Sequence, residues 1–174
     1  MEWTNMRVSK TRGRKPYTGS NPVPTAEMAA KPTSQLTISG AIVYKDYGGK
    51  RKFLIVKQNE DSEWEIPKVT VRRGESSVRA ALRMTGEIAG MSTTVLEEAG
   101  RSSGATVVNG KSMPVKYYYY LLVQRAGGEM FGFARFEWLE FGVALKKISL
   151  KKEKEMLKSA KVVLKDWEKA RKIK

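Results

Sequence analysis

Residues Trp64–Met91 read WEIPKVTVRRGESSVRAALRMTGEIAGM, which predicts a short strand, a loop and one helix. Pro67 interrupts the strand, because proline lacks the backbone N–H that a strand ladder uses. Ser76 or Ser77 can cap the first turn of the helix, and Gly90 can end it. We expect the rest of the chain to be organised around this strand–loop–helix unit.

The spacing within this unit resembles the signature of the Nudix hydrolase family. That signature reads G, five residues, E, seven residues and then REUXEEXGU, where U is a bulky aliphatic residue. Glu75, Arg83 and Gly90 stand at their signature positions, and the lead-in from Trp64 to Lys68 resembles the segment that usually precedes the signature. The resemblance implies an α/β fold, a Nudix α/β/α sandwich with a mixed sheet.

Three signature positions carry other residues. Val69 replaces the opening glycine, Met84 replaces the first glutamate, and Ile88 replaces one of the paired glutamates beside Glu87. In the family the three glutamates hold a divalent metal against a diphosphate. Positions 84, 87 and 88 share one face of an α-helix, which here offers a single carboxylate. Because Mg²⁺ requires oxygen ligands, we predict a degenerate Nudix box whose metal site does not assemble.

The composition of the 174 residues excludes several kinds of site. The chain contains no cysteine and no histidine, so it has no disulfide, no thiolate or imidazole zinc site and no Ser–His relay. No apolar run approaches the roughly 20 residues of a membrane-spanning helix. We expect an intracellular, cytoplasmic protein without a membrane partner. A mitochondrial or other organellar location is the alternative, but the prolines near the N-terminus disfavour a presequence.

The net charge of +15 is concentrated at the two ends of the chain. Residues 1–34 carry six Lys or Arg against two Asp or Glu, residues 35–145 carry fifteen against twelve, and residues 146–174 carry twelve against four. Basic ends on a nearly balanced middle favour contact with polyanions, most often nucleic acid. A lysine-rich surface that only keeps the protein in solution is the alternative.

The sequence divides into a basic, Pro/Gly-rich arm over residues 1–34 and a domain over residues 35–174, whose C-terminal helix covers 150–174. Within the arm, KTRGRKPY resembles an AT-hook, although Lys15 separates the second arginine from the proline. A generic basic tail along RNA or DNA phosphates fits the arm better.

The remaining pattern predicts alternating strands and two helices. Strands are expected over 37–44, 53–56, 93–99, 105–108, 115–123 and 131–139. The chain between 93–99 and 105–108 is expected to form a loop over 100–104, and a short helix is expected over 141–148. The apolar stripe of the last helix is predicted to consist of Met156, Ala160, Val163, Trp167 and Ala170.

The run Tyr117–Tyr120 permits two interpretations. Because side chains alternate along a strand, two rings point to each face of the sheet. One pair can pack in the core while the other covers an edge or lies under a helix. Alternatively, Tyr118 and Tyr120 form a stacking surface for bases or a nucleotide beside Lys116 and Arg125.

The leading functional prediction is a catalytically degenerate Nudix-fold protein that binds nucleic acid, RNA in preference to DNA. It would act as a subunit of a larger ribonucleoprotein or nucleoprotein assembly, with other proteins as partners and no cofactor. Basic residues of the two ends, the signature loop and the tyrosine strand are expected to contact the nucleic acid. They are Arg7, Lys10, Arg12, Arg14, Lys15, Arg72, Arg73, Lys116, Lys151, Lys152 and Lys158.

The alternative is a Nudix hydrolase that cleaves nucleoside diphosphate-linked or dinucleoside polyphosphate substrates with Mg²⁺ or Mn²⁺. The resemblance around Trp138 to dinucleoside polyphosphatases implies such substrates. Glu87 and Glu75 would then bind the metal, Arg83 would orient a glutamate, and a further ligand would be Glu129 or Glu137. Glu75 and Arg83 have an equally open structural interpretation, in which they pair to fix the loop on the helix.

Overall fold

The computed structural model describes residues 35–172, and the arm predicted over residues 1–34 lies outside them. No helix of the described range is both long and apolar enough to cross a membrane. The chain forms, in order, β1 (Leu36–Tyr47), β2 (Lys50–Lys57), β3 (Lys68–Thr70), α1 (Ser77–Arg83), a π-helical turn (Met84–Ile88), β4 (Met91–Val108), β5 (Lys111–Gly127), β6 (Arg135–Glu140), α2 (Phe141–Lys147) and α3 (Lys151–Lys172).

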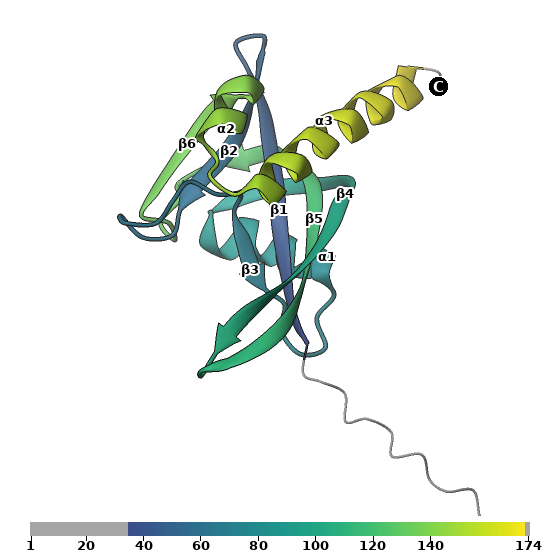
Figure 1. Cartoon of the computed structure of the whole chain (residues 1–174). Coiled ribbons are helices and arrows are strands. Elements are labelled where there is room, and N and C mark those ends of the chain that lie inside the picture. Colours follow the sequence, from purple (N-terminus) through teal and green to yellow (C-terminus); the bar gives the residue numbers. More distant parts are fainter. Residues whose placement is uncertain (1–34, 173–174) are drawn as a thin grey trace, which may run out of the picture. The chain divides into compact units, whose positions relative to one another are not determined.

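The strands form one mixed sheet in the order β4-β5-β1-β2-β6, and the short β3 pairs with β1. β1 and β5 run parallel, whereas the other neighbouring strands run antiparallel. α1 lies on one face of the sheet, and α2 and α3 lie on the other (Figure 1). The predicted α/β/α sandwich with a mixed sheet is confirmed.

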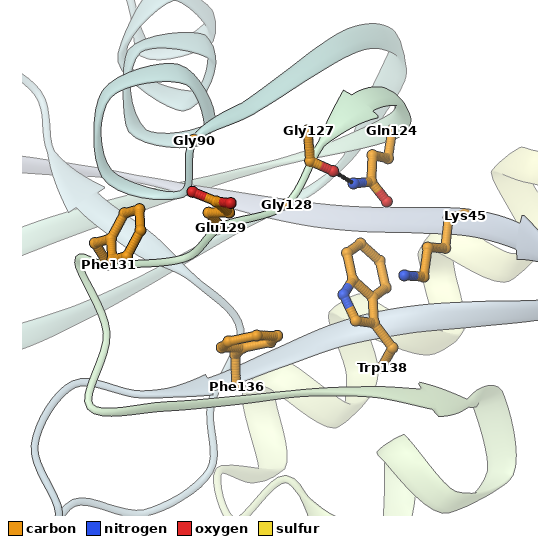
Figure 2. A pocket seen from close by; sticks show the side chains of 9 residues that line it. All are labelled: Lys45, Gly90, Gln124, Gly127, Gly128, Glu129, Phe131, Phe136 and Trp138. Atoms are coloured by element: carbon orange, nitrogen blue, oxygen red, sulfur yellow. Dashed lines mark hydrogen bonds between the residues drawn. The ribbon is translucent and has the colours of Figure 1, made fainter.

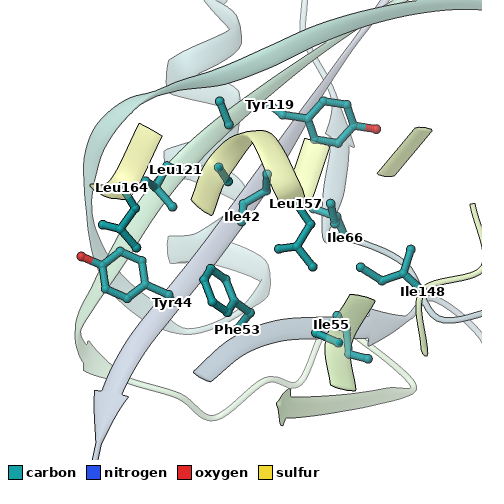
Figure 3. Close-up of a cluster of buried hydrophobic side chains, with 13 residues drawn as sticks. Ile42, Tyr44, Phe53, Ile55, Ile66, Tyr119, Leu121, Ile148, Leu157 and Leu164 are labelled. Carbon is teal, nitrogen blue, oxygen red and sulfur yellow. The ribbon is translucent and has the colours of Figure 1, made fainter. Parts of the chain in front are cut away.

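Alternation along β1 divides the buried side chains between the two faces. Ile42 and Tyr44 point toward α3, where they pack with Leu157 and Leu164 (Figure 3). Ala41 and Val43, which alternate with them along β1, point toward α1. Each face of the sheet therefore has its own hydrophobic core.

The buried stripe of α3 differs from the predicted one. Its buried residues are Glu153, Leu157, Ala160 and Leu164. Met156 and Val163 lie beside this stripe and are only partly buried, and Ala170 is exposed. The predicted stripe is therefore displaced by about one residue around the helix from the buried stripe. The sequence did not reveal this, because Glu153, a charged residue, occupies a fully buried position.

The hairpin of β4 and β5 is longer than predicted. The loop expected over 100–104 is wrong, because β4 continues through these residues in antiparallel pairing with β5. The serines and glycines there suggested a loop, but register shifts such as the one between Glu98 and Gly100 absorb them within the strand. The predicted turn at Asn109-Gly110 is confirmed, and both residues have positive φ angles, of 51° and 74°.

Candidate functional site

The signature loop is held by an ion pair between Glu75 and Arg83. Arg83 Nε lies 2.8 Å from Glu75 Oε1, and its Nη2 donates to Oε2 at 3.0 Å. The backbone N–H of Arg72 donates to the same carboxylate at 2.9 Å. The hydrogen bond from Arg83, followed by the one from Arg72, lowers the pKa of Glu75 to about 2. The carboxylate of Glu75 is therefore engaged by the loop that it fixes.

The signature helix changes its geometry halfway. α1 ends at Arg83, and the backbone N–H of Ala89 then donates to the carbonyl of Met84 at 3.1 Å, five residues back. In this π-turn Met84 is fully buried, whereas the Glu87 side chain is 64% exposed. Met84 and Ile88 pack in the same core, whereas Glu87 is exposed to solvent, so the three positions do not present their side chains together.

The residues present do not fit the divalent metal that the signature implies. Met84 offers a buried thioether, and Ile88 lies against Gly132, whose N–H donates to the Ile88 carbonyl at 3.2 Å. Glu87 has Arg72 4.0 Å away as its nearest cation. Within residues 35–172, no group of three or more acidic side chains is placed to hold a metal ion. Oxygen ligands are too few for Mg²⁺ at this turn.

A cleft of about 740 Å³ lies on the α1 face of the sheet, bordered by β1, the end of β5, the loop before β6 and β6 (Figure 2). Its lining combines aromatic rings, glycines, one cation and one carboxylate. These residues are Lys45, Gly90, Gln124, Gly127, Gly128, Glu129, Phe131, Phe136 and Trp138. Glu87 is not among the residues that line the cleft.

Lys45 is the one cation among the described residues that line the cleft. Its Nζ lies 4.3 Å from the centre of the Trp138 ring, and it forms no ion pair with a described carboxylate. Burial, followed by repulsion from Lys52, lowers the pKa of Lys45. Phe136 is 41% exposed and Phe131 is 87% exposed. The cleft thus presents an uncompensated cation beside accessible aromatic rings, which suits an aromatic compound that carries an anion.

The structure separates the two glutamates considered as a further metal ligand. Glu129 lines the cleft. Glu137 instead accepts from Lys147 Nζ at 2.6 Å. Sequence reasoning did not single out Lys45, although alternation after Ala41 and Val43 places it on the α1 face of β1.

The two candidate stacking tyrosines differ in exposure. Tyr120 is 9% exposed, and its hydroxyl lies 2.6 Å from Ser77 Oγ, so no ring face is open there for a base. Tyr118 is half-buried, with the Arg101 guanidinium 5.1 Å from its ring centre. Tyr117 and Tyr118 both border a hollow of the surface.

The predicted nucleic-acid contacts fall into separate groups. Lys116 lines a hollow along β4 and β5, whereas Lys151 and Lys152 line one between the β4–β5 hairpin and the start of α3. Lys158 is exposed further along α3, and Arg72 with Arg73 lies in the signature loop. The residues of the arm lie outside the described residues, and they are Arg7, Lys10, Arg12, Arg14 and Lys15.

The chain resembles solved structures of Nudix proteins. A C. elegans Ap4A hydrolase in a binary complex has 24% sequence identity and a TM-score of 0.61, over 75% of this chain and 98% of that one. An E. coli dihydroneopterin triphosphate pyrophosphohydrolase has 13% identity and a TM-score of 0.58, over 70% and 91%. The NUDIX domain of Shewanella oneidensis NrtR, complexed with ADP ribose, has 16% identity and a TM-score of 0.55, over 75% and 89%.

No protein-family model matches the sequence, and no curated protein matches it. The structural similarities nevertheless agree with one another, because each covers at least 70% of this chain. The described domain has the Nudix fold.

Proposed function

We propose that this domain binds a nucleotide, or a metabolite built like one, in the cleft between Lys45 and Phe131, without the three-glutamate metal centre of the Nudix signature. The observation that carries the proposal is the position of Lys45. Its ammonium is partly desolvated, faces Trp138 and has no carboxylate partner in the described chain. A phosphate of the ligand would provide the missing counter-charge.

The rings that border the cleft complete the ligand chemistry. Phe136 and Trp138 alternate with Glu137 along β6, so both project from the α1 face, and Phe131 stands opposite them in the preceding loop (Figure 2). A nucleobase can stack on such rings while its phosphate reaches Lys45. The similar structures whose names mention Ap4A and ADP ribose support a ligand of this class.

Calorimetric titration with ADP-ribose, Ap4A and ATP tests the proposal, first in the presence of a chelator and then with Mn²⁺. We expect binding that survives the chelator and weakens roughly tenfold or more in Lys45→Met, because a charged hydrogen bond is lost. Lys111→Met is the matched control, since it removes an exposed lysine at the tip of the hairpin. Equal affinities of these two variants, or binding only with Mn²⁺, would refute the proposal.

Hydrolysis is the second candidate, favoured by the similarity to Ap4A hydrolase and by two acidic side chains, Glu129 in the cleft and the exposed Glu87. Release of products from Ap4A that rises with Mn²⁺ and falls in Glu87→Gln or Glu129→Gln would establish it. Nucleic-acid binding stays a separate prediction, because its residues lie outside this cleft.

A further inference from the structure

Tyr117 borders two hollows of the surface. One, of about 270 Å³, lies along β4 and β5 and is also bordered by Arg101 and Lys116. The other, of about 390 Å³, lies between β5 and the start of α3 and is also bordered by Lys151 and Lys152. Because side chains alternate along β5, Lys116 projects from the face opposite to Tyr117, so the second hollow alone forms what we call the hairpin–helix surface.

Two lysines give this surface an uncompensated positive charge. Lys151 is exposed and forms no ion pair with a described carboxylate. Lys152 Nζ donates to the backbone carbonyl of Ser103 at 2.6 Å, which leaves its charge unneutralised. In contrast, Arg101 is paired with Glu98 at 2.6 Å.

Tyr117 is held in place while part of its ring remains accessible. Its ring stacks on that of the buried Tyr119, with centroids 6.4 Å apart and planes 15° apart. Gly104 leaves the space beside it open, because a Cβ at this position would lie 3.8 Å from Tyr117 Cε2 and 3.7 Å from Lys152 Nζ. Gly104 therefore leaves space between the Tyr117 ring and the ammonium group of Lys152.

We propose that the hairpin–helix surface binds single-stranded nucleic acid, with phosphates on Lys151 and Lys152 and a base against Tyr117. A ring that borders a hollow can take up only an unpaired base, because the bases of a duplex are stacked on one another. Both lysines lie at the start of α3 beside this ring, so a strand that crosses the ring would meet two adjacent cations. This function is separate from the cleft that contains Lys45.

The test uses the full-length protein and labelled oligouridylate, oligothymidylate and duplex RNA over a series of salt concentrations. Lys151→Ala/Lys152→Ala is compared with Lys165→Ala/Lys172→Ala, which removes the same charge from exposed positions further along α3. We expect the first pair to lower the slope of log affinity against log salt by roughly 1.4, about 0.7 for each lost phosphate contact. The second pair should leave the slope unchanged, and any contribution of the N-terminal arm is common to both.

Two variants without a charge change test the stacking. Tyr117→Leu should weaken single-strand binding roughly tenfold, and Gly104→Leu should weaken it by filling the space beside the ring. Circular dichroism and thermal unfolding verify that both variants fold. Crosslinking of wild-type protein to 4-thiouridine RNA, mapped by mass spectrometry, provides an independent readout at Tyr117.

Several outcomes would overturn the proposal. They are equal salt slopes for the two lysine pairs, full affinity in both folded variants, crosslinks confined to residues 1–34, and binding of duplex RNA or an acidic peptide as tight as that of the single strands. The relative affinities of oligouridylate and oligothymidylate then identify RNA or DNA as the source of the strand.

Discussion

The two faces of the sheet are covered to different extents. On one face α2 and the 22-residue α3 cover the strands, and side chains from β1, β2 and β5 pack beneath them. On the other face α1 has 7 residues and is followed by a π-turn of 5 residues. This shorter cover leaves the cleft beside β6 open (Figure 2).

The two faces also differ in whether a lysine is paired with a carboxylate. Under α3, the buried Glu153 accepts from Lys68 Nζ at 2.6 Å and from the Ile66 N–H at 2.8 Å. Burial alone would lower the pKa of Lys68, but attraction to Glu153 and Glu65 outweighs it and raises the pKa. On the α1 face Lys45 has no such partner. The buried charge of Lys68 and Glu153 is therefore compensated within the fold, whereas the charge of Lys45 is available for a ligand.

Breaking the ion pair between Lys68 and Glu153 should have the largest effect on stability. Lys68→Met leaves the Glu153 carboxylate buried and without its cation, which we expect to lower the free energy of unfolding by about 3–5 kcal/mol. Denaturant unfolding followed by circular dichroism measures the loss. The double variant Lys68→Met/Glu153→Gln should recover part of it, because the buried Glu153 charge is then removed while Glu65, 2.6 Å from Lys68 in the wild type, still lacks its cation.

Lys147→Met is the control for this prediction. It breaks the half-exposed pair with Glu137, whose side chain is 37% exposed, and should cost less than about 1 kcal/mol. A loss as large as that of Lys68→Met would contradict the distinction between covered and exposed charge.

Introducing an uncompensated charge beneath α1 tests the other face. Met84 is fully buried there, so Met84→Glu should lower the free energy of unfolding by about 3 kcal/mol. It should not create a binding site for Mn²⁺, because the side chain points into the core rather than toward Glu87. Met84→Leu, which keeps an apolar side chain of similar size, should cost less than about 1.5 kcal/mol. A stable Met84→Glu variant that binds Mn²⁺ would instead show that this position is a lost ligand on an exposed face.

Much of the fold could be predicted from local patterns. Strand alternation, the turn at Asn109-Gly110 and the signature spacing of Glu75 and Arg83 led to the correct sandwich. The π-turn could not be predicted, because a hydrogen bond from Ala89 to Met84 leaves no mark in residue spacing. The extent of β4 was also missed, because cross-strand pairing overrides the loop preference of Gly and Ser.

Less of the candidate site than of the fold could be predicted from the sequence. The Glu75–Arg83 pair was anticipated as a structural possibility from its spacing alone. Lys45 was not, because its importance depends on the short cover of α1 and on Trp138, which approaches it from a strand more than ninety residues later in the chain. The sequence placed Tyr117 in a run of four tyrosines, and its position beside the lysines at the start of α3 became evident only in the structure.

The pH dependence of nucleotide binding tests the proposed role of Lys45. Its pKa is lowered from 10.5 in the free protein, and a bound phosphate would favour the charged form and raise it again. Nucleotide affinity should therefore be highest below the free-state pKa and fall as the pH rises through it toward 10.5. Calorimetry over this range should show the fall in wild type and Lys111→Met but not in Lys45→Met. A profile shared by all three proteins would remove Lys45 from the site.

The smallest effect is expected at Glu75, whose partly buried pair with Arg83 belongs to the loop rather than to either core. The pKa of Glu75 is lowered from 4.5 to about 2 in the folded protein, so its stabilising contribution is fully present above about pH 4.5. This contribution is lost as the pH falls from 4.5 toward 2. The stability difference between wild type and Glu75→Gln should accordingly be constant near neutral pH and shrink across this acidic range. Glu97→Gln, which removes an exposed carboxylate without a described ion pair, is the control. If the two variants follow parallel curves, the pair with Arg83 does not stabilise the signature loop, and Glu75 remains available for another role on the open face.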